Sequence, residues 1–76
     1  MDIRKLVGEN VRLARQRKGW SQEDLGFEAK LHRTYISQVE RGVINPSIVV
    51  IEQLALALDI KPALLFANWL QPLKAK

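Results

Sequence analysis

Hydrophobic residues recur along this chain at the spacing of amphipathic helices. Apolar side chains form one face over residues 3–18, and further apolar stripes follow over about 22–29, 33–41 and 48–58. The β-branched run Ile48–Ile51 would also suit a buried strand. However, the helical spacing continues for two more turns, and no second strand is available to pair with it. The pattern therefore predicts an all-α fold in which Ile3 and Ile48 each begin an inward-facing stripe.

Capping residues set the expected limits of these helices. Ser21 is a favoured N-cap, and Asp24 three residues later can complete a capping box. Gly42 is expected to end the helix over 33–41, and Ser47 is expected to cap the one that follows. Asp59 stands where a glycine C-cap is common, and Asp tolerates the left-handed conformation that such a position needs.

A fifth helix is expected over about 62–71. Pro62 is suited to a first helical position, and Pro72 would end the helix. Its apolar residues are too many for a free surface helix on so small a monomer, so we expect it both to cover the core and to form a dimer interface. The apolar residues of this segment are Leu64, Leu65, Phe66, Trp69 and Leu70, of which Leu65, Phe66, Trp69 and Leu70 are the expected interface residues.

Length and composition limit the function classes. The 76 residues are expected to form one domain over 1–76. Absence of cysteine and the single histidine, His32, exclude a thiolate or multi-histidine metal site, and no nucleophile–base pair suggests an enzyme. No stretch is long and apolar enough for a membrane span, no signal-peptide pattern occurs, and we expect a cytoplasmic protein. We expect no cofactor and no small-molecule ligand.

Charge and side-chain chemistry point to nucleic acid. The net charge is +4, and no basic residue occurs between Val43 and Ile60. Residues 21–42 read as two short helices joined by a tight turn, with polar side chains on the outer face of the second. Such donors form hydrogen bonds with base edges and phosphates in the DNA major groove. The outward polar set is Arg33, Thr34, Ser37, Gln38 and Arg41.

These residues occur within a longer set of matches to a known family. The chain resembles the phage-repressor and Cro-type (XRE-like) helix-turn-helix family over roughly residues 6–66. Its segment 31–37 is also similar to the recognition segment of restriction–modification controller proteins. The motifs that carry the resemblance are Gly8-Glu-Asn-Val-Arg12, Lys18-Gly19, Ser21-Gln22, Ile36-Ser37, Glu40-Arg-Gly42, Asn45-Pro46-Ser47 and Leu54-Ala-Leu-Ala-Leu58.

The resemblance implies a compact five-helix, lambda-repressor-like domain that binds double-stranded DNA as a homodimer. It implies a partly buried ion pair between Arg15 and Glu40 that ties the first helix to the third. Tyr35 is left open between packing inside and lying against DNA. The candidate base-reading residues are Arg33, Thr34, Tyr35, Ser37 and Gln38. The candidate phosphate contacts are Arg12, Lys18, Ser21, Gln22, Arg41 and Asn45.

Three positions in the motif depart from the family pattern. Gly26 stands where the family usually has Ala at a close helix–helix contact. Lys30 stands where the turn usually has a left-handed Gly, which implies some backbone strain. His32 replaces the usual Ser or Thr cap of the recognition helix, so its ring nitrogen would cap that helix or point at DNA.

The sequence thus predicts a transcriptional regulator that binds a pseudo-palindromic operator through residues 33–41. A controller of restriction–modification genes is the favoured circuit. An antitoxin or phage-type repressor is the alternative within DNA binding. A protein-interaction adaptor that reuses the fold is the alternative outside it.

Overall fold

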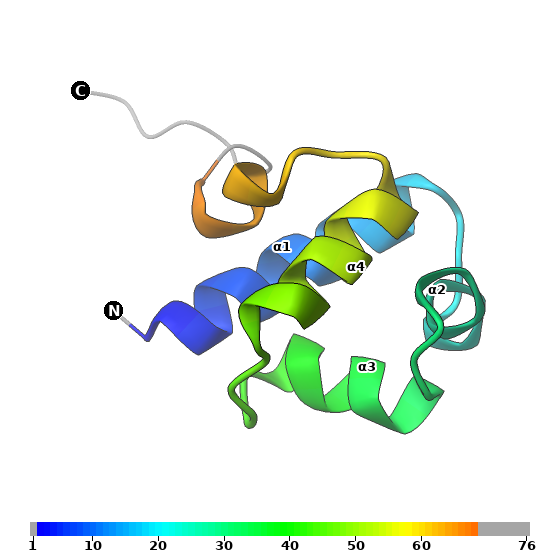
Figure 1. The fold of residues 1–76 in the computed structure, drawn as a ribbon, viewed down its shortest axis with the longest axis horizontal. Helices are drawn as coiled ribbons and strands as arrows, with labels where there is room; N and C mark the ends of the chain where they lie inside the picture. The colour runs from blue at the N-terminus through cyan, green and yellow to red at the C-terminus, as the bar shows by residue number, and fades with distance from the viewer. Residues whose placement is uncertain (1, 69–76) are drawn as a thin grey trace.

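The computed structural model describes residues 2–68, and these form a helical domain. Its elements are α1 (Ile3–Arg17), α2 (Gln22–Ala29), α3 (Arg33–Arg41), α4 (Ile48–Leu58) and a 3₁₀ helix, η1 (Pro62–Phe66). Figure 1 shows α3 along one edge of the molecule, with α1 and α4 crossing above it and α2 at one end. The all-α fold and a helix-turn-helix at about 21–42 are confirmed for the part of the chain that is described.

The caps place these helix ends where the sequence predicted them. The Ser21 hydroxyl accepts a hydrogen bond from the Asp24 amide at 3.0 Å, and the Asp24 carboxylate accepts one from the Ser21 amide at 2.9 Å. This reciprocal pair satisfies two amides that the first turn of α2 leaves without helical partners. Gly42 and Asp59 both adopt the left-handed conformation, at φ 71° and 60°, and end α3 and α4.

A single apolar core joins all five elements. Its fully buried side chains come from α1, α2, α3, α4 and η1 in turn, and include Val11, Leu25, Ile36, Leu54 and Leu65. Removing such side chains from water is the main favourable term in folding a domain of this size. The core holds α3 by its inner face and leaves its outer face to solvent.

The prediction of a fifth α-helix is wrong, because the segment forms a short 3₁₀ helix. Over the described residues the chain has four α-helices, and the segment after Pro62 is a 3₁₀ helix that ends at Phe66. Ala67 already has extended dihedrals of φ −118° and ψ 169°. The remainder of the predicted 62–71 helix, including residues 69–71, lies outside the described residues.

Asn10 supplies the physical reason for this ending, and sequence analysis missed it. Its side-chain amide is completely buried and donates to the carbonyl oxygens of Leu65 and Ala67 at 2.8 and 2.6 Å. These carbonyl groups therefore find partners on α1 instead of in a following helical turn. A buried polar side chain thus fixes η1 against α1.

Two positions of the predicted inward stripes are also wrong. Ile3 is 50% exposed and Ile48 is 87% exposed. Each is the first residue of its helix, and both side chains line a surface groove beside Phe66. The other members of both stripes are buried or half-buried.

Candidate DNA interface

The turn before α3 sets the position of the recognition helix. Lys30 has the left-handed conformation that the family resemblance implied for this position, with φ 61°. The Leu31 amide then donates to the Gly26 carbonyl at 2.8 Å, which closes the turn. A Cβ on Gly26 would lie 2.5 Å from the Leu31 carbonyl oxygen, so α2 and the turn approach as closely as glycine allows.

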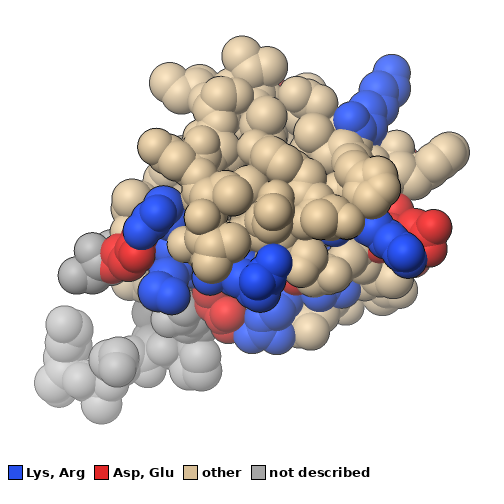
Figure 2. Space-filling model, turned by 90° about the horizontal axis from the view of Figure 1, so that it is seen from below, with Lys and Arg blue, Asp and Glu red and all other residues tan. Residues whose placement is uncertain are grey.

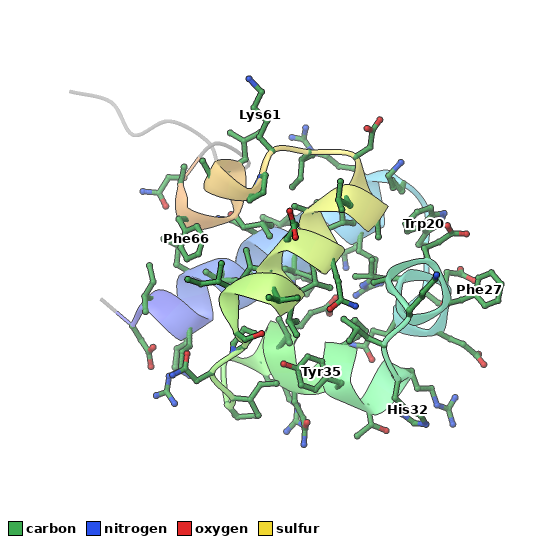
Figure 3. The ribbon with its side chains drawn as sticks, viewed as in Figure 1. Trp20, Phe27, His32, Tyr35, Lys61 and Phe66 are labelled. Carbon is green, nitrogen blue, oxygen red and sulfur yellow. The ribbon has the colours of Figure 1, made fainter. Side chains whose placement is uncertain are left out.

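His32 is the N-cap of α3, as one of its two predicted roles required. Its Nδ1 accepts a hydrogen bond from the Thr34 amide at 3.0 Å. Nδ1 of a neutral imidazole can accept only when Nε2 carries the proton. The ring is exposed, and Figure 3 shows it at the lower edge of the molecule where α3 begins.

The carboxylate of Glu40 anchors the other end of α3. Its two oxygens accept from Arg15 Nε at 2.7 Å and from Arg15 Nη2 at 3.0 Å, and the predicted ion pair is confirmed. Gln22 Nε2 donates to the same carboxylate at 3.0 Å. The side chains of Arg15 and Glu40 are only 12% and 3% exposed, so the interaction is weakly screened by solvent. α1, the start of α2 and α3 therefore meet at one group.

The predicted polar face of α3 does point away from the core. Ile36 and Val39 are buried on the inner side. Arg33, Thr34 and Arg41 are exposed, and Ser37 and Gln38 are half-buried. Tyr35 is half-buried and packs against the core cluster, and Figure 3 shows its ring beside α3. The inner face of α3 is therefore fixed to the core, and its outer polar face is open to solvent.

The other candidate phosphate contacts occupy different settings. Ser21 and Asn45 are exposed, and Gln22 already bonds to Glu40. The Arg12 guanidinium donates to Glu9 at 2.6 Å, and this hydrogen bond raises the pKa of Arg12, which remains charged. Lys18 Nζ lies 4.9 Å from the centre of the Trp20 ring, within cation–π range.

Figure 2 shows the molecule from the side on which α3 lies. Most of the Lys and Arg side chains lie across the lower half and the right side of this view, beside a surface without charged groups, and a few carboxylates lie among them. Basic groups gathered on the side that carries α3 suit a polyanion.

The predicted dimer residues separate into three groups. Leu65 is wrong as an interface residue, because its side chain is 0% exposed within its own subunit. Phe66 is 47% exposed and remains available. Trp69 and Leu70 lie outside the described residues.

An exposed apolar surface that the sequence did not predict surrounds Phe66. Ile48 and Val49 on α4 are 87% and 64% exposed, and Ile3 on α1 is 50% exposed. Together with Pro62 and Ala63 these residues line two adjoining grooves. We call the surface made by Ile3, Ile48, Val49 and Phe66 the apolar face. The sequence feature that could have revealed this face is the run of β-branched residues at the start of α4. The run contains more apolar residues than a single inward-facing stripe can bury.

Within residues 2–68, no helix combines the length and the hydropathy that crossing a membrane requires. The same residues hold no group of three or more metal-ligating side chains placed for a metal ion.

Comparison with known proteins agrees with this geometry. A family model described as Helix-turn-helix matches residues 11–65. The control protein C.BamHI of Bacillus amyloliquefaciens is 50% identical over 62 residues, which cover 80% of this chain and 76% of that protein. The crystal structure of the restriction–modification controller protein C.AhdI from Aeromonas hydrophila is 48% identical, with a TM-score of 0.80, and the match covers 83% of this chain and 96% of that one.

A third relative has been solved with DNA. The tetramer of the controller protein C.Esp1396I in complex with its natural 35-base-pair operator has a TM-score of 0.80 and 31% identity, and the match covers 92% of this chain and 91% of that one. The family model matches most of the chain, and relatives are similar over most of their own length. The chain therefore belongs to the XRE-like helix-turn-helix family of transcriptional regulators.

Proposed function

We propose that this protein is a sequence-specific DNA-binding transcriptional regulator that controls restriction–modification genes. One observation carries the proposal: the polar face of α3 is exposed while its inner face and its last turn are fixed to the rest of the domain. A helix presented this rigidly can enter the major groove with little ordering cost. The similarity to two controller proteins, at 50% and 48% identity, favours that circuit.

Each side chain of α3 has a role suited to its chemistry. Arg33 pairs with guanine through two donors, and Gln38 pairs with adenine through its amide. Thr34, Ser37 and the edge of Tyr35 make neighbouring base contacts. Arg41 at the last turn grips a phosphate. The further phosphate contacts are Arg12, Lys18, Ser21, Gln22 and Asn45.

Two subunits join through the apolar face. Exposed apolar groups of this size on a small domain are costly unless covered. A second copy that covers Ile48, Val49 and Phe66 by two-fold symmetry would leave both α3 helices uncovered, because α3 lies along a different edge of the molecule. Successive half-sites would then lie about 34–36 Å apart, which is one turn of DNA. The operator is accordingly pseudo-palindromic.

On this proposal the protein catalyses no reaction and is not controlled by a bound effector. Its level in the cell would set operator occupancy, because occupancy rises with the concentration of dimer. We expect it in the cytoplasm, where a regulator of this family meets DNA.

Selection of bound duplexes from a random pool tests the proposal. The full-length protein should enrich one site with two-fold symmetry. Arg33→Ala should then weaken binding to that site by about 1–3 kcal/mol, whereas binding to random duplex changes little. Lys61→Ala is the matched control, because Lys61 is an exposed basic residue at the opposite edge of the molecule from α3.

Failure to enrich any site would overturn the proposal. Equal losses for Arg33→Ala and Lys61→Ala would also overturn it, because affinity would then depend on net charge and not on α3.

A further inference from the structure

The two nitrogens of the His32 ring have different hydrogen-bonding roles. Nδ1 is occupied as the acceptor for the Thr34 amide at 3.0 Å, and no other side chain donates to or accepts from the ring among the described residues. This bond fixes the tautomer, so Nε2 carries a hydrogen on the far side of the ring. The ring itself is exposed.

The place of that hydrogen is set by the backbone of the turn. His32 has extended dihedrals of φ −67° and ψ 145°, and the cap bond holds the ring across the first turn of α3. Arg33 and Thr34, the first two residues of the candidate base-reading face, follow it directly and are also exposed. A Ser or Thr cap would satisfy the same amide but would have no group extending beyond it.

We propose that His32 is a specificity residue, which caps α3 through Nδ1 and donates an Nε2–H hydrogen bond to duplex DNA. The inference rests on the proposed function, and extends it to a residue outside α3 itself. The acceptor is an oxygen or nitrogen of the DNA, either at a base edge in the major groove or on a phosphate. A donor fixed by its own cap loses little conformational freedom on binding, so the bond retains more of its energy.

Two near-isosteric variants separate the two tasks. His32→Asn keeps an acceptor close to the ring position of Nδ1, and Asn is a favoured N-cap, but its own amide N–H2 stops short of the place of Nε2. His32→Gln can extend an amide N–H2 to about the place of Nε2, but Gln is a poor cap. Binding of each full-length variant to the selected duplex is measured together with its melting temperature.

His32→Asn should melt like the wild type and bind the selected duplex about three- to tenfold more weakly, as expected for one lost hydrogen bond. His32→Gln should melt at a lower temperature yet keep more of the affinity than His32→Asn. Repeating the site selection with His32→Asn identifies the acceptor. A preference relaxed at one base position indicates a base edge, and an unchanged preference with a uniform loss indicates a phosphate.

Affinity of His32→Asn equal to that of the wild type would overturn the inference and leave the proposed function intact. Failure of the wild type to bind any duplex specifically would overturn both. The Lys61→Ala control distinguishes a local contact at His32 from a general effect of surface substitution.

Discussion

Gly26→Ala is expected to destabilise this protein, although the substitution normally favours a helix. In the middle of a helix, Ala is favoured over Gly by about 0.8–1.0 kcal/mol. At Gly26, however, the new Cβ would lie 2.5 Å from the Leu31 carbonyl oxygen and 3.3 Å from the Arg33 amide nitrogen. Both neighbours are backbone atoms, which cannot rotate away as a side-chain end can. The turn itself would have to move.

The net change in stability is the difference between the steric cost of the new methyl group and the gain in helix propensity. Overpacking costs about 1–3 kcal/mol, and the gain in helix propensity offsets less than half of the upper value. Because the contact is with backbone at 2.5 Å, we expect the upper part of this range, a net loss of about 1–2 kcal/mol. The melting temperature should fall by about 4–8 °C for each kcal/mol in a domain of this size. Displacement of Arg33 should also weaken specific DNA binding.

Thermal unfolding followed by circular dichroism measures the stability term. Glu28→Ala is the control, since Glu28 is on the exposed side of the same helix and should change stability by no more than about 0.5 kcal/mol. A Gly26→Ala variant as stable as the wild type, or more stable, would refute the reasoning. It would show that the turn between α2 and α3 adapts to a methyl group at no cost.

Three other predictions use contacts already described. Leu65→Ala should lose about 2–5 kcal/mol of unfolding free energy in denaturant titration, because the side chain is fully buried. Phe66→Asp should instead keep the fold and sediment as a lighter species, because Phe66 is exposed. Loss of folding in both variants would contradict the assignment of Leu65 to the core and of Phe66 to the interface. Glu40→Ala should lower the free energy of unfolding by about 3–5 kcal/mol in the same titration, because it leaves the largely buried Arg15 charge without its carboxylate partner. A loss below about 1 kcal/mol would show that the Arg15–Glu40 ion pair does not anchor α3. The Arg4 side chain and amide, by hydrogen bonding, lower the pKa of Asp2 from 3.8, so the stabilising effect of this cap is present above that value and is lost as the pH falls through the lower folded value. Hydrogen exchange at the Arg4 amide should therefore keep its protection down to pH 3.8 and lose it only at lower pH, and no such loss is expected in Asp2→Asn.

Local signals predicted the helix-turn-helix well. The capping box at Ser21 depends on two residues three positions apart, and it is confirmed. The left-handed conformation at Lys30 and the capping role of His32, one of its two expected roles, were carried by the family resemblance, and both are confirmed. The Arg15–Glu40 ion pair spans 25 residues and was still predictable, because the family resemblance carried it. The outward orientation of the α3 polar face is confirmed too, whereas its individual DNA contacts remain predictions.

Errors in the sequence analysis came from contacts that no local pattern records. The end of η1 depends on Asn10, which lies 55 residues before Leu65. Helical periodicity also assigns one apolar stripe to each helix, so it placed Ile48 inward and passed over Val49. A surface shared by the first turns of α1 and α4 and by η1 becomes visible only when the three are brought together.

Convergence of α1, α2 and α3 on the carboxylate of Glu40 has a mechanical consequence. The groove-entering helix cannot rock or slide within its subunit without breaking a largely buried cluster of charged hydrogen bonds. Any mismatch between the distance separating two subunits and the distance separating two half-sites must then be absorbed elsewhere, by bending or twisting of the duplex or by a pivot where the subunits meet. Base pairs that no side chain touches would influence affinity through their stiffness, because they would take up that deformation.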